Sequence, residues 1–195
     1  MDNEFLNLVS SPLMNLDHTY RYSGTKLVED ESLSQHIVDT IMMGLKIIDH
    51  INYLSGDLIL IPGVYVMKAV YHDLEECITG DIPRPLKYYN KDTLKSMKDV
   101  ADKVAKEFFS AEFHDGGFTH YWEWDNAKSG DEGYILKLVD TLVVANKVVK
   151  EVTMLNNMYM LKVAHEVSSY LMELHNYTIE YPNFSGESLI YYSAP

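Results

Sequence analysis

The sequence predicts an all-α protein built as one helical bundle. Several long segments carry apolar residues at spacings of three and four, which place those residues on one face of an α-helix. Segments with the signals of strands are too few to build a sheet. At 195 residues, 47% apolar and 23% charged, the chain has an ordinary globular composition and can form one sizeable core. We therefore expect a single domain over residues 1–195, with about six to eight helices.

The acidity of the chain restricts its partners. The net charge is −13, so the long-range field repels polyanions, and we expect neither a nucleic-acid polymer nor a membrane as a partner. A phosphate-bearing substrate would have to be held by local cations. Only two of the 16 basic residues are arginines, Arg21 and Arg84, and the planar guanidinium group suits bidentate phosphate binding.

Three features of the sequence predict a cytoplasmic protein. No apolar run reaches the roughly 18 residues of a membrane span. The first residues, 1–5, lack the basic start of a signal peptide. The single cysteine, Cys77, fits a reducing compartment. A phage protein made in the cytoplasm of its host would show the same features.

The first third of the chain predicts a short helix, a loop and a long helix. Apolar residues over 4–15 favour a short helix with Pro12 as its stop. The segment 19–24 is rich in turn formers and places aromatic residues around an arginine. Residues 32–35 have the Ser-x-x-Gln form of a capping box, so a helix begins there and His36 falls at its fourth position.

The middle of the chain predicts two further helices. The short apolar run 58–61 is compatible with either a strand or a buried segment. A helix from about Val64 ends at Thr79-Gly80, because glycine is expected just after a helix. After two prolines, a helix starting at Asp92 has the most regular apolar spacing in the chain, and we assign it to the scaffold.

The remaining segments predict a loop region followed by two helices. We expect a solvated loop at His114–Gly117 and a polar loop over Asp125–Gly133. The aromatic run 120–124 between them is suited to covering either a ligand or a dimer surface. An apolar helix over 133–146 follows, then a long helix over 151–176. The tyrosine-rich tail begins at about residue 177.

The stretch from Val70 to Lys87 contains an adjacent histidine and aspartate, His72 and Asp73. On a helix, adjacent side chains point about 100° apart, so a shared target such as a metal ion would explain the pair. An imidazole nitrogen and a carboxylate oxygen suit Mn²⁺, Co²⁺, Fe²⁺ or Zn²⁺ better than Ca²⁺. A hydrogen-bonded core histidine is the alternative interpretation.

Asp140 is a second unusual feature, after the His72-Asp73 pair, because it is an acid in the middle of a predicted apolar helix. A charged carboxylate is costly there unless it is ion-paired, hydrogen-bonded or bound to a metal. Three predicted helices thus offer His36, then His72 with Asp73, and then Asp140. Four such ligands would leave octahedral positions for water and substrate, and a bound ion lowers the pKa of water and neutralises phosphoryl charge.

The sequence resembles the HD-domain metal-dependent phosphohydrolases, and within them the compact bacterial 5′-deoxynucleotidases of the YfbR-like type. The resemblance lies in Arg21-Tyr22, in Glu31–His36, in Val139–Thr141 and above all in the run from His72 to Lys87, which reads HDLEECITGDIPRPLK. This long pattern is far more specific than a bare His-Asp pair.

The resemblance assigns roles to individual residues. It implies one divalent transition metal, Co, Mn, Zn or Fe, held by four ligands: His36, His72, Asp73 and Asp140. It makes Glu76 the proton-transfer residue and Asp81 a residue that orients substrate or water. Arg21 and Lys87 match phosphate-side cations.

Two further positions complete the expected substrate site. The family usually has tryptophan where this chain has Tyr22, which lies near the sugar or base and leaves the base preference open. Arg84 lies between the two prolines of the motif, and we include it among the substrate-binding candidates.

Three functions are compatible with these residues. The first is hydrolysis of a deoxynucleoside 5′-monophosphate to nucleoside and phosphate. The second is a deoxynucleoside triphosphohydrolase of the dATP type, which the signature also resembles, with a second Mg²⁺ to offset the added charge. The third is a non-catalytic, nucleotide-binding helical protein with a structural metal. The resemblance and the exposed aromatic residues favour a dimer or a higher homo-oligomer.

Overall fold

The computed structural model describes residues 11–87, 89–113 and 117–175, and within these ranges it contains helices and one isolated bridge but no strand. The all-α prediction is confirmed. Six helices have nine residues or more: α2 (Leu33–Ser55), α3 (Pro62–Tyr71), α6 (Lys91–Glu112), α7 (Gly117–Asp125), α8 (Gly130–Val149) and α9 (Leu161–Leu174). Single turns form α4 (Glu76–Thr79) and α5 (Arg84–Lys87), and short 3₁₀ or π segments form η1 (Pro12–Asn15), η2 (Lys150–Met154) and η3 (Met158–Met160).

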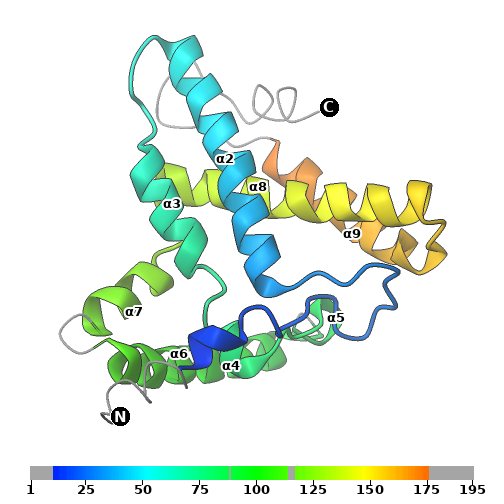
Figure 1. The fold of residues 1–195 in the computed structure, drawn as a ribbon, viewed down its shortest axis with the longest axis horizontal. Coiled ribbons are helices and arrows are strands. Elements are labelled where there is room, and N and C mark those ends of the chain that lie inside the picture. The colour runs from blue at the N-terminus through cyan, green and yellow to red at the C-terminus, as the bar shows by residue number, and fades with distance from the viewer. Residues whose placement is uncertain (1–10, 88, 114–116, 176–195) are drawn as a thin grey trace.

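The helices form two packed groups (Figure 1). In the first, α2 crosses α8, with α3 beside α2 and α9 along α8. In the second, α6 packs with α7 and lies close to α4 and α5. Each group has its own cluster of buried apolar side chains. The end of α3 and the loop after it connect the two groups, and the candidate site lies there.

Close packing between α2 and α3 depends on Gly44. The hydroxyl of the buried Tyr65 donates a hydrogen bond of 2.7 Å to the backbone oxygen of Thr40. A Cβ atom at Gly44 would overlap the Tyr65 ring. The absence of a side chain at this position therefore allows the two helices to approach.

We expect Gly44→Ala to destabilise the protein by about 2 kcal/mol, because the overpacked Tyr65 must shift, although alanine normally stabilises a helix. Gly63→Ala in α3 is the matched control, since a Cβ there meets nothing within 4 Å. Urea unfolding of both variants provides the measurement. Equal stabilities would show that the Tyr65 contact does not limit the packing.

The predicted helix from Val64 to Thr79 is wrong, because it is interrupted. α3 begins at Pro62, whose fixed φ suits a first helical position, and ends at Tyr71. The following turn is held by a 3.2 Å hydrogen bond from the Leu74 amide to the Tyr71 carbonyl. A second turn, α4, then ends before Gly80, whose φ is +71°. The interruption lies at the His-Asp pair.

Other boundaries also differ from the prediction. Pro12 begins η1, because proline is tolerated in a first turn. The part of the expected 4–15 helix up to residue 10 lies outside the described residues. The run 58–61 is not a strand, because the Asn52 side chain makes hydrogen bonds to the backbone of Ile59 and Leu60. The expected helix from residue 151 starts only at Leu161.

The aromatic run 120–124 lies within α7, a helix that was not predicted. The expected polar loop is shorter than predicted, because α8 already begins at Gly130. The His114–Asp115 pair and the tail from residue 177 lie outside the described residues. None of the helices in the described ranges combines the length and apolar character needed to cross a bilayer.

Candidate metal centre

Four predicted ligands converge where α2, α8 and the end of α3 meet. One ligand atom from each of His36, His72, Asp73 and Asp140 can be chosen so that all four atoms lie within 4.8 Å of one another. Both histidines and Asp73 are buried, and the side chain of Asp140 is 26% exposed. The interruption after α3 explains why adjacent residues can act together, because His72 caps the helix and Asp73 follows in the turn.

The contacts within this cluster fit a metal ion better than a hydrogen-bonded core. His36 Nε2 lies 3.1 Å from Asp140 Oδ1, and His72 Nε2 lies 3.0 Å from Asp73 Oδ2. Yet both Nε2 atoms and Asp140 Oδ1 are buried and have no hydrogen-bond partner of good geometry among the described residues. Buried polar atoms without partners require an explanation. A cation shared by these atoms would supply it.

The second nitrogen of His72 supports this interpretation. His72 Nδ1 lies 2.8 Å from the carbonyl oxygen of Ala69. Nδ1 therefore acts as the donor, which leaves the Nε2 lone pair directed at the cluster, as in metal-binding histidines.

The electrostatic environment favours the protonation states that bind metals. Burial raises the pKa of Asp73, but the close contact with His72 and the charge of Lys128 outweigh burial and hold that pKa well below its usual range. Burial also raises the pKa of Asp140, but contact with His36 and Arg21 lowers it below its ordinary value. Burial, with the charge of Arg21, lowers the pKa of His36. Charged carboxylates and neutral imidazole are the required forms.

Two cations contact the cluster from different loops. Arg21 Nη1 lies 3.3 Å from Asp73 Oδ2, and its other amino group lies 3.9 Å from Asp140 Oδ1. Lys128 Nζ lies 3.3 Å from Asp73 Oδ1. The Lys128 ammonium was not predicted, because the sequence shows only a lysine in a polar loop. The contact with Asp73 spans 55 positions in the chain.

The loop that carries Arg21 is tied to the start of α2. The Arg21 amide donates to the Glu31 carbonyl at 2.9 Å, and an isolated antiparallel bridge joins Tyr20 to Ser32. The Ser32 side chain accepts a hydrogen bond from the Gln35 amide at 3.2 Å, which confirms the N-terminal cap of the helix that carries His36. This arrangement holds Arg21 and His36 on the same side of the site.

Glu151 fixes the far end of this loop. Its carboxylate accepts hydrogen bonds of 3.0 Å from the amides of Val28 and Glu29 and one of 2.6 Å from Asn157. Burial raises its pKa, but these hydrogen bonds outweigh burial and lower the pKa to about 2. Glu151 was not predicted as an important residue, because the two backbone amides that it accepts from lie more than 120 positions away in the chain.

The lowered pKa of Glu151 predicts how the stability of the folded protein depends on pH. Because its folded pKa of about 2 lies below its usual 4.5, its stabilising contribution is present above pH 4.5 and is lost as pH falls toward 2. We expect Glu151→Gln to be less stable than the parent chain near neutrality, with a gap that narrows over that window. Urea unfolding at several pH values measures the gap, and a gap that is independent of pH would contradict the assignment.

Glu76 and Asp81 line a cavity of about 510 Å³. Glu76 Oε2 is buried and has no hydrogen-bond partner among the described residues. Burial and the charge of Asp73 raise the pKa of Glu76 well above its ordinary value. Asp81 accepts a 3.0 Å hydrogen bond from the Ser23 amide, so it also anchors the loop of Arg21.

The structure gives less information on the other predicted substrate-binding residues, which are Tyr22, Lys87 and Arg84. The Arg21 guanidinium lies 5.9 Å from the centre of the Tyr22 ring, and Tyr22 has a φ of +63°. Such a backbone conformation is uncommon outside glycine and often marks a functional site. Lys87 ends α5 and makes none of the ion pairs formed within the described ranges. The backbone of Arg84 begins α5.

Two acidic residues near the cluster were not predicted as site residues. Glu31 Oε1 lies 3.5 Å from Arg21 Nε and 3.7 Å from His36 Nδ1. Glu75 accepts a 2.5 Å hydrogen bond from the indole of Trp124, and burial together with the charge of Asp73 raises its pKa to about 7. The aromatic run of α7 thus helps to enclose the site, a contact that spacing alone does not reveal.

The structure and sequence match known proteins. The fold is similar to the solved structure of an HD-domain phosphohydrolase from Listeria innocua, with a TM-score of 0.74 and 20% identity, over 88% of this chain and 80% of that chain. A 5′-deoxynucleotidase of Photorhabdus laumondii is 29% identical over 118 residues, or 59% of this chain and 58% of that protein.

The 5′-deoxynucleotidase YfbR of Salmonella typhi is 28% identical over 137 residues, which cover 69% of this chain and 67% of that protein. The family model described as 5′-deoxynucleotidase YfbR-like matches residues 9–185, far more than half of the chain. The predicted resemblance is thereby confirmed, and the chain belongs to the YfbR-like 5′-deoxynucleotidase family.

Proposed function

We propose that this chain is a divalent-metal-dependent phosphohydrolase that breaks the bond between the α-phosphorus and the 5′ oxygen of a deoxynucleotide. The observation that carries the proposal is the convergence of two histidine nitrogens and two aspartate oxygens. Three of these atoms are buried and have no hydrogen-bond partner of good geometry among the residues that the structure describes. The names of the related proteins support a deoxynucleoside 5′-monophosphate as the substrate, with nucleoside and phosphate as products.

His36, His72, Asp73 and Asp140 would hold the ion, and their mixed nitrogen and oxygen donors suit Mn²⁺, Co²⁺, Fe²⁺ or Zn²⁺. When bound, such an ion lowers the pKa of water and neutralises charge on the phosphoryl oxygens. Arg21 lies within 4 Å of two of the carboxylates. It is therefore positioned to bind a phosphoryl oxygen of a substrate placed at the cluster.

Glu76 is our candidate for proton transfer. Its raised pKa keeps a proton available in a buried position near Asp73. In the reaction, an oxygen–phosphorus bond forms to water, the bond from phosphorus to the 5′ oxygen breaks, and that oxygen takes up a proton. Asp81 holds the neighbouring loop and contributes to the same cavity, so it is placed to orient substrate or water.

A triphosphohydrolase is the second candidate, because the same phosphorus–oxygen bond is broken when triphosphate leaves a deoxynucleoside. Lys128 favours this candidate, since it adds a second cation at the cluster. A second Mg²⁺ would then balance the charge of the substrate. A purely structural metal site is less favoured, because such a site has no use for a carboxyl group such as that of Glu76, whose buried Oε2 has no hydrogen-bond partner among the described residues.

A product assay tests the proposal. Deoxynucleoside mono- and triphosphates are incubated with the protein and Mn²⁺, Co²⁺ or Mg²⁺, and phosphate and triphosphate are resolved by chromatography. Phosphate from monophosphates is the expected result, and triphosphate from dATP or its relatives supports the second candidate. No hydrolysis of any substrate, with metal bound, would favour the non-catalytic binding protein. The homo-oligomer and the cytoplasmic location remain predictions.

A further inference from the structure

Glu31 lies beside the candidate metal centre without being one of its ligands. It precedes Ser32, the N-cap of α2, and ends the loop that carries Arg21. Glu31 is only 3% exposed, and its Oε1 atom is buried and has no hydrogen-bond partner among the described residues. A buried carboxylate is costly unless cations or hydrogen-bond donors compensate for the lost water. The groups that face Oε1 therefore matter.

Two buried nitrogen atoms face this oxygen. His36 Nδ1 lies 3.7 Å from Glu31 Oε1, and Arg21 Nε lies 3.5 Å from the same atom. Both nitrogens are buried and, like Oε1, have no hydrogen-bond partner within the described ranges. Three polar atoms that need partners thus lie next to one another. Shifts of about 0.5–0.7 Å would bring both contacts to hydrogen-bond length.

The two histidines of the cluster differ in what faces their second ring nitrogen. His72 Nδ1 has a backbone partner, the carbonyl oxygen of Ala69 at 2.8 Å. The group that faces His36 Nδ1 is instead the carboxylate of Glu31. A metal-binding histidine normally donates from its second nitrogen to a carbonyl or a carboxylate, which fixes the ring and leaves the other nitrogen to bind the ion. Glu31 is in the position to do this for His36.

The same oxygen of Glu31 also faces the phosphate-side cation. The two terminal amino groups of Arg21 lie 3.3 Å from Asp73 and 3.9 Å from Asp140. Glu31 contacts the third nitrogen of this guanidinium, Nε. The backbone adds to the link, because the Arg21 amide donates to the Glu31 carbonyl at 2.9 Å. Glu31 therefore restrains Arg21 at the nitrogen that pairs with neither aspartate.

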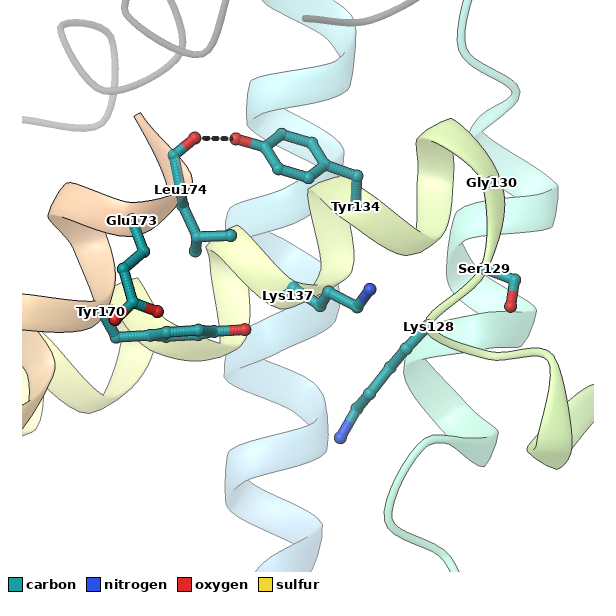
Figure 2. Close-up of a pocket in the computed structure, with 8 residues that line it drawn as sticks. All are labelled: Lys128, Ser129, Gly130, Tyr134, Lys137, Tyr170, Glu173 and Leu174. Carbon is teal, nitrogen blue, oxygen red and sulfur yellow. Dashed lines mark hydrogen bonds between the residues drawn. The ribbon is translucent and has the colours of Figure 1, made fainter. Parts of the chain in front are cut away.

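The other cation at the cluster is held independently of Glu31. Lys128 lies on the loop before α8, where it lines a cavity of about 680 Å³ together with residues of α8 and α9 (Figure 2). Its Nζ lies 3.3 Å from Asp73 Oδ1, and among the ion pairs of the described residues it has none with Glu31. A substitution at Glu31 thus leaves one cation in place next to Asp73. Its effects can be assigned to His36 and Arg21.

We propose that Glu31 is a positioning residue that links metal binding to phosphate binding, because its Oε1 atom accepts one hydrogen bond from His36 Nδ1 and one from Arg21 Nε. This inference rests on the proposed function. The first bond orients His36 so that Nε2 is directed at the ion. The second holds the Arg21 guanidinium toward the substrate phosphate. Glu31 takes no part in the bond changes of the reaction.

The first test measures metal binding in the absence of substrate. Chelator-treated protein is titrated with Co²⁺ at about pH 8, well above the ordinary pKa of a glutamate, because burial raises the pKa of Glu31 while the charges of Arg21 and Lys147 oppose that rise. We expect Glu31→Gln to weaken Co²⁺ binding about tenfold or more, since the amide keeps the size of the side chain but is a weaker acceptor.

Asp30→Asn is the matched control for this titration. It removes the same charge from the neighbouring residue, which is exposed. The Co²⁺ affinity should stay within about twofold of that of the parent chain, because exposed charges are screened by salt. Equal weakening in Glu31→Gln and Asp30→Asn would show that net charge, and not a contact with His36, sets the affinity, and would overturn the inference.

The second test measures hydrolysis of dAMP at saturating Co²⁺. We expect Glu31→Gln to raise KM about tenfold and to lower kcat by less than about threefold, because the phosphate contact of Arg21 is weakened while the ion and Glu76 remain in place. Glu31→Ala should show a larger rise in KM, so that the glutamine variant restores part of the function. A purely structural role would lower the free energy of unfolding and leave both KM and the Co²⁺ affinity unchanged.

The two tests separate this inference from the proposed function. A parent chain that hydrolyses dAMP, with a Co²⁺ affinity or a KM that Glu31→Gln leaves unchanged, would overturn the inference and leave the proposed function intact. If the parent chain binds Co²⁺ but hydrolyses no nucleotide, the proposed function fails. Calorimetry of inorganic phosphate binding to the Co²⁺-loaded protein then replaces KM, and weaker binding in Glu31→Gln than in Asp30→Asn would still support the inference.

Discussion

Replacing Asp73 with asparagine is expected to abolish metal binding and to lower kcat/KM at least about a thousandfold while the helices remain folded. The substitution keeps the size of the side chain but removes the charge that lies 3.0 Å from His72 Nε2. It also leaves the cations Arg21 and Lys128 without their shared partner, which further repels a metal ion. Metal content by mass spectrometry and hydrolysis rates provide the measurements.

Asp99→Asn is the matched control, because Asp99 is exposed on α6. It should retain both metal and activity. Circular dichroism of both variants separates loss of the site from loss of the fold. A folded Asp73→Asn protein with full activity would refute the assignment of Asp73 as a ligand.

Replacing Glu76 with alanine is expected to leave metal binding intact and to slow hydrolysis at least about a hundredfold, which is the usual range for a lost general acid or base. The reason is its position beside the cluster, where its Oε2 atom is buried and has no hydrogen-bond partner within the described part of the chain. Glu107→Ala is a suitable control, because that side chain is 71% exposed on α6. The readout is kcat at saturating metal and substrate, and an unchanged kcat would remove Glu76 from the mechanism.

The ligands could be predicted from the sequence because each had a local signal. The capping box fixed where the helix of His36 begins, and the structure has Leu33 as its first residue. Asp140 was identifiable because an acid inside an apolar helix needs a partner, and its contact with His36 supplies one. The long motif from His72 to Lys87 identified the family.

The interruption of the helix at Asp73 could not be predicted, because no glycine or proline occurs between Val64 and Thr79. The turn depends on tertiary packing, which overrides local helix propensity. Tertiary contacts also explain why the last helix starts later than the predicted residue 151. Glu151, whose carboxylate accepts from two amides more than 120 positions away, is held in a π segment there, and α9 starts only at Leu161.

Lys128 and Glu31 were missed for a related reason. Each contacts the cluster through a charge pair, and the identity of a residue as lysine or glutamate does not by itself indicate such a contact. Only the three-dimensional arrangement shows that these groups balance the charges of Asp73 and Arg21. The predicted role of Lys87 depends instead on the family motif, and its contacts within the described residues add no support to it.

The most direct test of the metal centre is a titration of chelator-treated protein with Co²⁺, followed by its visible absorption and by the hydrolysis rate in parallel. We expect one ion per chain, a spectrum typical of mixed nitrogen and oxygen ligands, and activity that rises in proportion to occupancy. The spectral change should be absent in Asp73→Asn. Hydrolysis that persists without a divalent ion, or a spectrum unchanged by the substitution, would contradict the account.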